Sequence, residues 1–331
     1  MPYPKISVVI PTYNVEPYIK ETLKSLLNQK KSPFEIVIIN DGSTDGTLEL
    51  LNNHFGHRSE LKIHTQANQG VGAARTKGLE LATGDYIFFC DPDDVVADNL
   101  FETFCSQIAA NPDLELFYFS KRSFIESPHG REFLRRNTAA TRNGAFDHGR
   151  ELLQDLILSQ KYNASTWQYI FKKTVADRFE ARFEGRAHED HLFSMNIYLH
   201  SKKTYATPQD CYFQRVRIGS LTQSKKDESY VLESYDAYQQ TLGALKLHIH
   251  QFSDSKSVAL NFMERNVSAL ITKCIKYNIK LPNRINTSSR KDARDCNIIW
   301  HGRSALIFPS IVFWLKMSKY NLRMVLKSLR S

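Results

Sequence analysis

The first 120 residues alternate short, continuous apolar runs with segments of helical periodicity. The run Ile6–Ile10 contains only apolar and small residues and ends at a proline, which is typical of a buried strand. Apolar strands that alternate with helices form a mainly parallel sheet covered by helices on both faces, so the predicted fold class is α/β. The predicted strands are Ile6–Ile10, Phe34–Ile39, Leu61–Thr65, Asp85–Cys90 and Leu114–Ser120, and the predicted helices are Glu16–Gln29, Asp45–Phe55, Gly70–Ala82 and Asn99–Ala110.

Polar segments follow the carboxyl ends of the first four predicted strands. Pro11–Asn14 follows the first strand, Asn40–Asp45 the second, the Asn68–Arg75 turn the third and Asp91–Asp94 the fourth. In sheets of this kind, ligands bind beyond the carboxyl ends of the strands. Because parallel strands end at the same edge of a sheet, these segments are expected to form one site.

The fourth of these segments carries Asp91, Asp93 and Asp94, three carboxylates within four residues. Such charges repel one another unless a cation neutralises them, and hard oxygen ligands suit Mg²⁺ or Mn²⁺ completed by water and substrate phosphates. The alternative is a solvated turn in which Asp94 or Asp98 caps the next helix. The convergence of polar segments at one edge favours the metal site.

The usual phosphate-binding motifs are missing. The sequence contains no GxxxxGK[ST] motif, and Gly70-Val71-Gly72-Ala73-Ala74-Arg75 departs from GxGxxG at its last position. That segment also follows the third predicted strand and not the first. A P-loop NTPase and a Rossmann dehydrogenase are therefore disfavoured, and a phosphate-bearing ligand held by a metal remains.

Three segments, in their order and spacing, resemble glycosyltransferase family 2 of the GT-A fold: SVVIPTYN, IINDGSTDGT and NQGVGAARTKGLELATGDYIFFCDPDD. The resemblance is dense over residues 5–125 and resumes at Trp167, at His188-Glu189-Asp190 and over residues 212–222. It implies an inverting, GT-A type catalytic domain over residues 1–225 that binds a nucleotide-sugar donor, usually UDP-linked, and a glycan acceptor. Thr76, where the family often has Asn, and Asn40, where Asp is common, depart from the pattern and bear on donor contacts.

The resemblance also implies roles for residues of the donor site. Uracil and ribose would be contacted near the end of the first strand, and a metal, Mn²⁺ or Mg²⁺, would bridge the diphosphate. The residues implied are Thr12, Tyr13 and Asp41 for the nucleoside, Arg75 for the nucleotide, Asp91 for the ribose or the metal, and Asp93 for the metal.

Sugar transfer needs a base, because the acceptor hydroxyl loses its proton as it attacks the anomeric carbon. Glu189-Asp190 matches the acidic pair of the family, which implies Asp190 as the base and Glu189 as the residue that orients it or the acceptor. The residues alone favour a cap on the helix His191–His200, since acidic side chains are stabilising in a first helical turn. The resemblance reverses that preference.

Four further residues are candidate acceptor contacts: Asp94, Trp167, Arg215 and Ser220. Core packing is the alternative for Trp167, and an ordinary surface loop is the alternative for Arg215, Arg217 and Ser220. The polar stretch Lys121–Asp147 lacks a clear period and is predicted to form a loop over the acceptor side.

Charge is distributed unevenly along the chain. Residues 251–331 carry 15 basic and 4 acidic side chains, whereas the first 250 residues carry 29 basic and 31 acidic ones. A nucleic-acid enzyme more often carries its basic residues around the active domain, so nucleic acid is not expected as a partner.

Residues 226–331 are predicted to form a helical C-terminal extension. Its tail, residues 316–330, repeats basic and apolar residues as an amphipathic helix that can lie on an anionic membrane surface. The preceding apolar run, Ala305–Leu315, has 11 residues and is too short to span a bilayer. A terminal helix packed on the catalytic domain is the alternative. The remaining expectations are helices over Tyr230–Phe252 and Val258–Tyr277 and a linker over Leu281–Asn297.

Five dispersed cysteines without a CxxC motif argue against a disulfide scaffold or structural zinc, and the N-terminus lacks a signal-peptide pattern. We therefore expect a cytoplasmic enzyme, peripheral on the inner face of the plasma membrane, that extends lipopolysaccharide, capsule or another lipid-linked glycan. The competing functions are a nucleotidyltransferase and a catalytically silent, membrane-associated glycan-binding protein. The joint presence of Asp91, Asp93, Glu189 and Asp190 argues against the silent protein.

Overall fold

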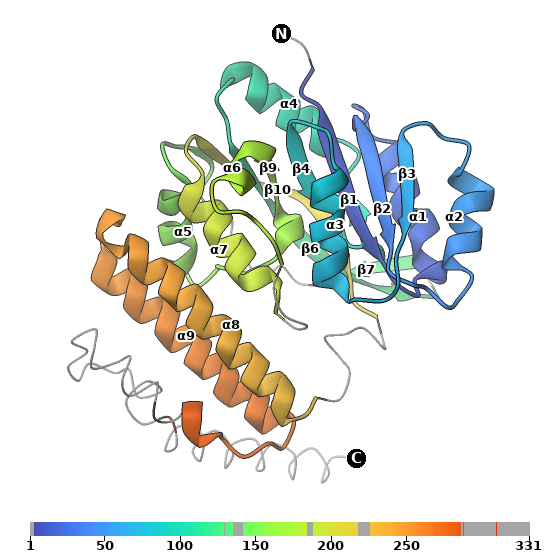
Figure 1. The fold of residues 1–331 in the computed structure, drawn as a ribbon. Helices are drawn as coiled ribbons and strands as arrows, with labels where there is room; N and C mark the ends of the chain where they lie inside the picture. The colour runs from blue at the N-terminus through green and yellow to red at the C-terminus, as the bar shows by residue number, and fades with distance from the viewer. Residues whose placement is uncertain are drawn as a thin grey trace. The chain divides into compact units, whose positions relative to one another are not determined.

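The computed structural model describes residues 3–128, 130–134, 142–183, 188–217, 226–285, 287 and 309. The chain divides into two compact units (Figure 1), of which the first comprises residues 1–156 and 163–220 and the second comprises residues 157–162 and 221–331. The predicted boundary between residues 225 and 226 stays a prediction, because residues 218–225 lie outside the described part of the chain.

A ten-stranded sheet forms the centre of the first unit, in the order β3-β2-β1-β4-β9-β6-β10-β5, with β7 beside β6 and β8 beside β10. The first four strands of this order are parallel to one another, as predicted. The sequence prediction located all four of them within two residues of their bounds, which are β1 Ile6–Thr12, β2 Glu35–Asn40, β3 Leu61–Thr65 and β4 Tyr86–Phe89.

Helices cover both faces of this parallel half (Figure 1). Ile6, Val8 and Ile10 of β1 belong to one apolar cluster with residues of α1, α2 and α4, whereas Val9 faces α3. This alternation follows from the two-residue period of a strand, and it explains why a run buried on both faces is continuously apolar. The helices are α1 Glu16–Leu27, α2 Thr47–Phe55, α3 Val71–Leu81 and α4 Leu100–Ala110, each within two residues of its predicted bounds.

Helix α3 approaches β1 so closely that only glycine fits at position 78. A Cβ atom at Gly78 would lie 2.2 Å from Val9 Cγ1 and 3.4 Å from Ile39 Cγ1. We expect Gly78→Ala to lower the free energy of unfolding by about 1–3 kcal/mol, because the helix or the strand must shift to relieve the overlap. Urea unfolding of the full chain measures this change.

Gly243→Ala is the matched control for this prediction. Gly243 lies inside α8 (Glu228–His248), and a Cβ atom there meets no described atom within 4 Å. This substitution is expected to stabilise the protein by about 0.5–1 kcal/mol through helix propensity alone. A Gly78 variant as stable as the Gly243 variant would contradict the close packing of α3 on β1.

The other strands make the sheet mixed. Strand β9 (Tyr169–Lys172) runs antiparallel between β4 and β6 (Leu116–Ser127). Strand β10 (Thr204–Arg215) runs parallel to β6 and antiparallel to the short strand β5 (Val95–Val96). Because β9 joins strands that lie far from it in the sequence, no local periodicity indicated this insertion.

The prediction of a loop over Lys121–Asp147 was wrong for most of its described residues. Strand β6 continues to Ser127, β7 (Gly130–Phe133) returns beside it, and β8 (Gly144–Phe146) pairs with β10. These strands are polar because much of their surface is exposed, so they lack the apolar run of a buried strand. Residues 135–141 lie outside the described part of the chain.

Four short helices complete the first unit. The N-terminus of the last of them carries the acidic pair predicted as the base, and this helix agrees with the predicted helix His191–His200. They are α5 Gly149–Leu158, η1 Thr166–Gln168, α6 Lys173–Asp177 and α7 Asp190–His200.

The second unit contains α8 and α9 (Ser255–Lys276), which pack against each other and are joined through η2 (Ile249–Gln251). Both helices were predicted. Asp227 and Asp254 cap their N-termini, because their carboxylates accept hydrogen bonds from backbone N–H groups at 3.1 and 3.0 Å. Among the described residues, no helix has the length and apolar character that crossing a membrane requires.

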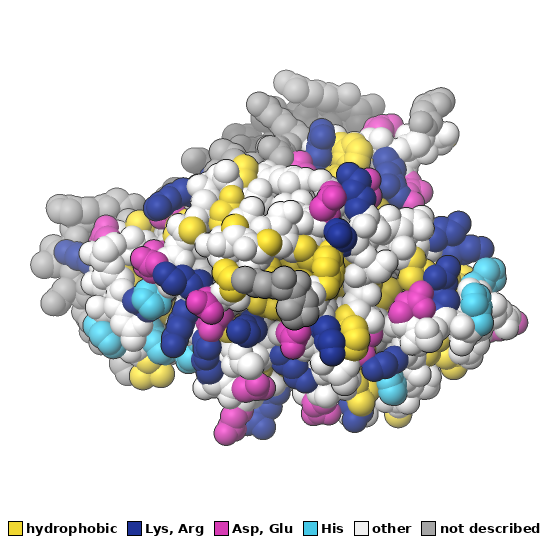
Figure 2. Space-filling model, turned by 90° about the horizontal axis from the view of Figure 1, so that it is seen from above, with side chains coloured by type: hydrophobic (Ala, Val, Ile, Leu, Met, Phe, Trp, Pro, Cys, Tyr) yellow, Lys and Arg dark blue, Asp and Glu magenta, His cyan; other side chains and the backbone are white. Residues whose placement is uncertain are grey.

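The predicted C-terminal tail stays a prediction. Residues 316–330, nearly all of Ala305–Leu315 and most of Leu281–Asn297 lie outside the described residues. Figure 2 shows the molecule from above, and on the visible described surface the basic and acidic side chains are interspersed. This agrees with the balanced charge of the first 250 residues.

Candidate active site

The carboxyl ends of the parallel strands bring the predicted polar segments together. The registers pair Thr12 with Asn40 and Asn40 with Thr65, and the backbone N–H of Asp41 donates to the carbonyl of Thr12 at 2.8 Å. The end of β4 lies on the other side of β1, where Phe89 pairs with Val9. The segments that follow β1, β2, β3 and β4 therefore meet at one edge, as the sequence predicted.

Asp41 is buried at this edge and shapes the turn that precedes α3. Its Oδ1 accepts hydrogen bonds from Gln66 Nε2 at 2.8 Å and from the backbone N–H of Gln69 at 2.9 Å. Its Oδ2 accepts one from the backbone N–H of Gly70 at 2.8 Å. Gly70 has a φ of +94°, which a residue with a side chain rarely adopts. The predicted nucleoside contact of Asp41 stays a prediction, and its carboxylate organises the loop around that position.

Thr12 and Tyr13 end β1 in different environments. Thr12 is buried, and its hydroxyl donates to the carbonyl of Ile10 at 3.2 Å. The Tyr13 side chain is exposed, at 47%. The exposed Tyr13 ring, at the carboxyl edge of the sheet, can stack on a planar base. The Thr12 side chain is buried, so a nucleoside would contact chiefly its backbone.

Arg75 lies at the centre of the site and joins its two halves. From α3, its guanidinium donates to Asp91 Oδ1 at 2.9 Å and to Glu189 Oε1 at 2.6 Å. The same group lies 5.7 Å from the centroid of the Phe183 ring. Asp91 follows β4 and Glu189 precedes α7, so one buried side chain connects the acidic segment to the predicted base region.

Burial and charge act in opposite directions on this cluster. Burial alone would lower the pKa of Arg75, but the carboxylates of Asp91, Glu189 and Asp190 outweigh it and raise that pKa. Burial raises the pKa of Asp91 and of Glu189, and Arg75 opposes this shift. Asp93 and Asp190 add repulsion that raises the same two pKa values further. The site thus concentrates negative charge around the buried guanidinium of Arg75.

A second arginine holds Asp93. Arg217 Nε donates to Asp93 Oδ2 at 2.6 Å, and both side chains are partly exposed. The Arg217 guanidinium also lies 4.8 Å from the centroid of the Tyr18 ring. Arginines therefore neutralise Asp91 and Asp93 in this structure. The sequence had predicted a metal ion as the counter-charge for these carboxylates.

Asp94 lies beneath the acidic segment and is almost completely buried. Its Oδ1 accepts a hydrogen bond from the backbone N–H of Arg215 at 2.7 Å. Burial and the two neighbouring carboxylates raise the pKa of Asp94 well above its usual range. The alternative of a helix cap was wrong for this residue and for Asp98, because α4 takes Asn99 as its N-cap.

The Arg215 side chain is buried and has protein partners on three sides. Its Nε donates to the carbonyl of Asp93 at 2.7 Å, and its two terminal nitrogens form ion pairs with Glu21 and Glu126. This guanidinium ties α1 and β6 to the acidic segment. The acceptor contact predicted for Arg215 would require one of these ion pairs to open.

Trp167 packs inside the unit, in agreement with the alternative of core packing. Its ring stacks on Tyr212 with centroids 4.6 Å apart and an interplanar angle of 10°. The Tyr212 hydroxyl accepts a hydrogen bond from the backbone N–H of Asp91 at 3.1 Å. Trp167 therefore supports the acidic segment through Tyr212. Ser220 lies outside the described residues.

Asp91 and Asp93 fit a divalent metal only in part. In the described part of the chain, no group of three or more His, Cys, Asp and Glu side chains is arranged to hold a metal ion. Asp91 and Asp93 each use one carboxylate oxygen in an arginine ion pair, and the other oxygen has no hydrogen bond to a described residue. Two such oxygens, with water and substrate phosphates, form the kind of donor set that Mg²⁺ or Mn²⁺ accepts. The donor set therefore fits a metal that binds together with a nucleotide.

Sequence reasoning missed Gly72 and Tyr212 as parts of this site. A Cβ atom at Gly72 would lie 3.0 Å from Glu189 Cγ and 3.3 Å from Phe183 Cβ. A small residue three positions before Arg75, on the same helix face, was the signal available for Gly72. No local signal indicated Tyr212, because its contacts depend on the docking of β10.

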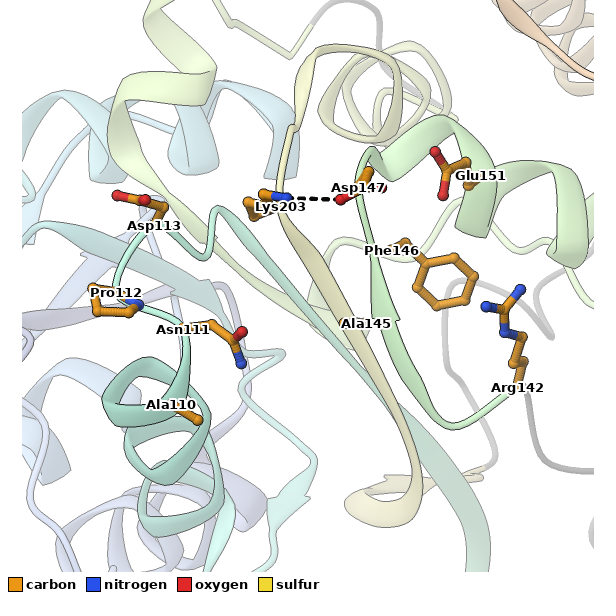
Figure 3. Close-up of a pocket in the computed structure, with 10 residues that line it drawn as sticks. All are labelled: Ala110, Asn111, Pro112, Asp113, Arg142, Ala145, Phe146, Asp147, Glu151 and Lys203. Carbon is orange, nitrogen blue, oxygen red and sulfur yellow. Dashed lines mark hydrogen bonds and ion pairs between the residues drawn. The ribbon is translucent and has the colours of Figure 1, made fainter.

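A cavity of about 380 Å³ lies apart from these residues (Figure 3). Asn111 and Asp113 line it from the segment after α4, and Phe146, the last residue of β8, and Asp147, which follows it, line it from the other side. Lys203 also lines it and pairs with Asp147 at 2.7 Å. Its lining includes none of the predicted site residues, so the converging charges at the strand ends define the candidate site.

Comparisons with known proteins agree with this geometry. Residues 7–153 match the family model described as Glycosyl transferase family 2. An uncharacterized glycosyltransferase of Bacillus subtilis, EpsJ, is 27% identical over 226 residues, which cover 66% of this chain and 63% of the relative. The poly(ribitol-phosphate) beta-glucosyltransferase of Bacillus spizizenii is 30% identical over 219 residues, which cover 64% of this chain and 32% of the relative. The match thus spans less than two thirds of the length of either relative.

Two solved structures share the fold. Residues 1–349 of S. aureus TarS superpose with a TM-score of 0.62 at 19% identity, covering 89% of this chain and 88% of that one. The mannosyltransferase PcManGT of Pyrobaculum calidifontis, solved with GDP-Man and Mn²⁺, superposes with a TM-score of 0.51 at 17% identity, covering 99% and 88%.

Proposed function

Because this chain is a family 2 glycosyltransferase with the GT-A fold, we propose that it transfers a sugar from a nucleotide-sugar, with inversion, to a hydroxyl of a cell-surface glycan. The observation that carries this proposal is the position of Arg75. It holds Asp91 of the expected donor segment and Glu189 of the acidic pair at the same time. A donor and an acceptor bound at these two groups would be neighbours.

The donor is proposed to be UDP-linked. The exposed ring of Tyr13 and the loop organised by Asp41 offer a surface for a planar base at the carboxyl edge of the sheet. TarS, which shares the fold, has been solved in complex with UDP-GlcNAc. Arg75 and Arg217 place positive charge beside the acidic segment, where the leaving diphosphate would accumulate negative charge.

Asp91 and Asp93 would hold a Mn²⁺ or Mg²⁺ ion, which acts as a Lewis acid toward the diphosphate when it is bound. For Asp93 to bind a metal with both oxygens, its ion pair with Arg217 must open. The Arg217 side chain is partly exposed, whereas the Arg75 side chain, which pairs with Asp91, is buried. We therefore assign Asp93 the more exchangeable position of the two.

Asp190 is proposed to take the proton of the acceptor hydroxyl. As the acceptor oxygen forms its bond to the anomeric carbon, the bond from that carbon to the diphosphate breaks, and the nucleoside diphosphate leaves. Attack opposite the leaving group inverts the configuration. Asp190 is more exposed than Glu189 and begins α7, so it is the carboxylate of the pair that an acceptor reaches first.

The acceptor is proposed to be a glycan, free or lipid-linked, in lipopolysaccharide or capsule synthesis at the inner face of the plasma membrane. The support is the series of relatives, among them the poly(ribitol-phosphate) beta-glucosyltransferase and an uncharacterized glycosyltransferase of Escherichia coli, YibD. The basic, amphipathic character of residues 316–330 supports the contact with an anionic membrane.

Calorimetric titration with a panel of UDP-sugars, with and without Mn²⁺, tests the donor site. We expect one UDP-sugar to bind in the presence of metal, and we expect Asp93→Asn to weaken that binding at least about tenfold through the loss of one metal ligand. Asp113→Asn, far from the acidic segment, is the matched control and should bind as the wild type does.

Three results would contradict these assignments. Metal-independent binding that Asp93→Asn leaves unchanged would remove Asp93 from the metal site. Failure of every UDP-sugar, followed by binding of a sugar linked to another nucleotide, would correct the donor. Failure of all nucleotides would favour the catalytically silent glycan-binding protein.

A further inference from the structure

Lys121 lies in β6 beside the site, where its ammonium group has neutral hydrogen-bond partners. Its Nζ donates to Gln214 Oε1 and, at 3.4 Å, to Ser123 Oγ. No carboxylate of a described residue forms an ion pair with this nitrogen, which lies 5.3 Å from the centroid of the Trp167 ring. Burial lowers the pKa of Lys121, and the charge of Asp94 opposes that shift.

Three arginines of this unit have carboxylate partners, whereas the half-buried Lys173 donates to the backbone carbonyl of Ala82. Arg75 pairs with two carboxylates, Arg178 pairs with Glu115, and Arg215 pairs with Glu21 and Glu126. Burying a cation without such a partner costs free energy, because neutral hydrogen-bond acceptors replace only part of the hydration that the charge loses. An anion that enters beside Lys121 would therefore be bound strongly.

Lys121 lies near the acidic segment but on a different strand, since its register partner Tyr212 accepts a hydrogen bond from the backbone N–H of Asp91 at 3.1 Å. Strand β9 lies between β4, which leads into Asp91, and β6, which carries Lys121. Two strand spacings correspond to about 10 Å. The registers pair Lys121 with Tyr212 and Ser123 with Gln214, so these side chains share the face of the sheet on which Trp167 stacks.

The same face leads to the predicted base. Helix η1, which contains Trp167, contacts α7, whose first residue is Asp190. The hydroxyl of Tyr169, just after η1, is hydrogen-bonded to Ser194 of α7 at 3.0 Å. Lys121 and Trp167 thus lie on the side of the sheet from which η1 contacts α7.

We propose that Lys121, together with Ser123 and Gln214, binds an anionic group of the acceptor, a phosphate or a carboxylate. The ammonium supplies the charge, and the Gln214 amide nitrogen supplies a further hydrogen-bond donor. The Ser123 hydroxyl, which donates to Gln214 Oε1 at 3.3 Å, would turn its hydrogen to the anion when the anion binds. This inference rests on the proposed function, because Asp190 marks the acceptor side. Lys121 would then make the enzyme selective for acceptors that carry a negative charge near the hydroxyl to be glycosylated.

The test reads the fluorescence of Trp167, which lies beside Lys121. Trp300→Phe and Trp314→Phe in the full chain leave Trp167 as the single tryptophan. This protein is titrated with glycerol 3-phosphate, with methyl glucuronide and with uncharged glycerol, each with and without saturating UDP and Mn²⁺. We expect a saturable signal from one of the two anions in the presence of UDP and none from glycerol.

Two lysine variants decide whether Lys121 is responsible. Lys121→Met is expected to weaken binding of that anion at least about tenfold, the size of a lost charge-assisted hydrogen bond. Lys203→Met is the matched control, because Lys203 is exposed and pairs with Asp147. Thermal unfolding of both variants verifies that each is folded.

The two anions also show which kind of acceptor is bound. A response to glycerol 3-phosphate indicates an acceptor that carries a phosphate, and a response to methyl glucuronide indicates one that carries a carboxylate. No binding of either probe, or unchanged binding by Lys121→Met, would overturn the proposal. Binding that UDP abolishes would assign Lys121 to the donor phosphates and overturn the acceptor assignment. Failure of UDP itself to bind would contradict the proposed function, and it is measured separately by calorimetry.

Discussion

Asp190→Asn is expected to lower kcat about 10²–10⁴-fold while donor binding stays unchanged. Asparagine keeps the size of the side chain and the first turn of α7, but it cannot accept the proton of the acceptor hydroxyl. Its neighbour Glu189 is held by Arg75 at 2.6 Å, which fixes the start of the helix on which Asp190 lies. Steady-state kinetics with the donor sugar identified by calorimetry, together with UDP titration, measure both quantities.

The alternative function of this residue, stabilising the first turn of α7, predicts a different result. Loss of one acidic residue at a helix N-terminus changes stability by about 0.3–1 kcal/mol and does not affect the chemical step. Glu151→Gln, in the first turn of α5, is the matched control and should retain full turnover. If the Asp190 variant turns over as fast as the wild type, the acidic pair only stabilises the helix. If the variant no longer binds UDP, Asp190 belongs to the donor site.

Arg75→Met is expected to lower the free energy of unfolding by about 3–5 kcal/mol, because it leaves Asp91 and Glu189 buried without a counter-charge. Methionine keeps an apolar stem of similar length against Phe183, so the loss of packing is small. Turnover should fall as well, since both halves of the site lose their common partner. Thermal and urea unfolding of the full chain measure the change in stability.

The destabilisation should depend on pH in a defined direction. Burial raises the native pKa of Asp91 and of Glu189, and removal of Arg75 raises both further above their unfolded values. A carboxyl group with a raised native pKa favours folding while it is protonated, and this contribution is lost as the pH rises through the native pKa. The stability deficit of Arg75→Met is therefore expected to grow from pH 5 to pH 8.

Arg178→Met is the matched control for the pH dependence. Arg178 pairs with Glu115, and this ion pair, opposed by burial, holds the pKa of Glu115 below its usual value. Because the native pKa of Glu115 is lowered and not raised, and because Glu115 keeps its hydrogen bond from the backbone N–H of Lys202, the deficit of the control variant should change less between pH 5 and pH 8 than that of Arg75→Met. A constant deficit for Arg75→Met would show that Asp91 and Glu189 find other partners when Arg75 is absent.

The parallel half of the fold was predictable because its information is local. Strands buried on both faces require continuous apolar runs such as Ile6–Ile10, and helices such as α1 repeat their apolar residues at helical spacing. Beyond Ser120 the helices α7, α8 and α9 were predicted, but the strands were not. There β6 and β7 form a partly exposed hairpin whose polar residues resemble a loop, and β9 inserts between β4 and β6 from a distant part of the chain.

The residues of the candidate site were predictable as a set, but their pairing was not. The resemblance implied roles for Arg75, Asp91, Asp93 and Glu189, and the structure brings Arg75, Asp91 and Glu189 into contact. The resemblance did not indicate that Arg75 would hold both Asp91 and Glu189. Local periodicity carries no information on which charged side chains meet, because that depends on the docking of whole elements.

The sequence by itself determined the parallel α/β half and the edge at which its polar segments converge, because strand burial and parallel order follow from local apolar patterns. Only the tertiary structure decided how the charges at that edge are balanced. Arg75 reaches Glu189 across 114 residues and Arg217 reaches Asp93 across 124. These contacts exist because α7 packs against the sheet and β10 joins it beside β6, and long-range packing, not local periodicity, sets both positions.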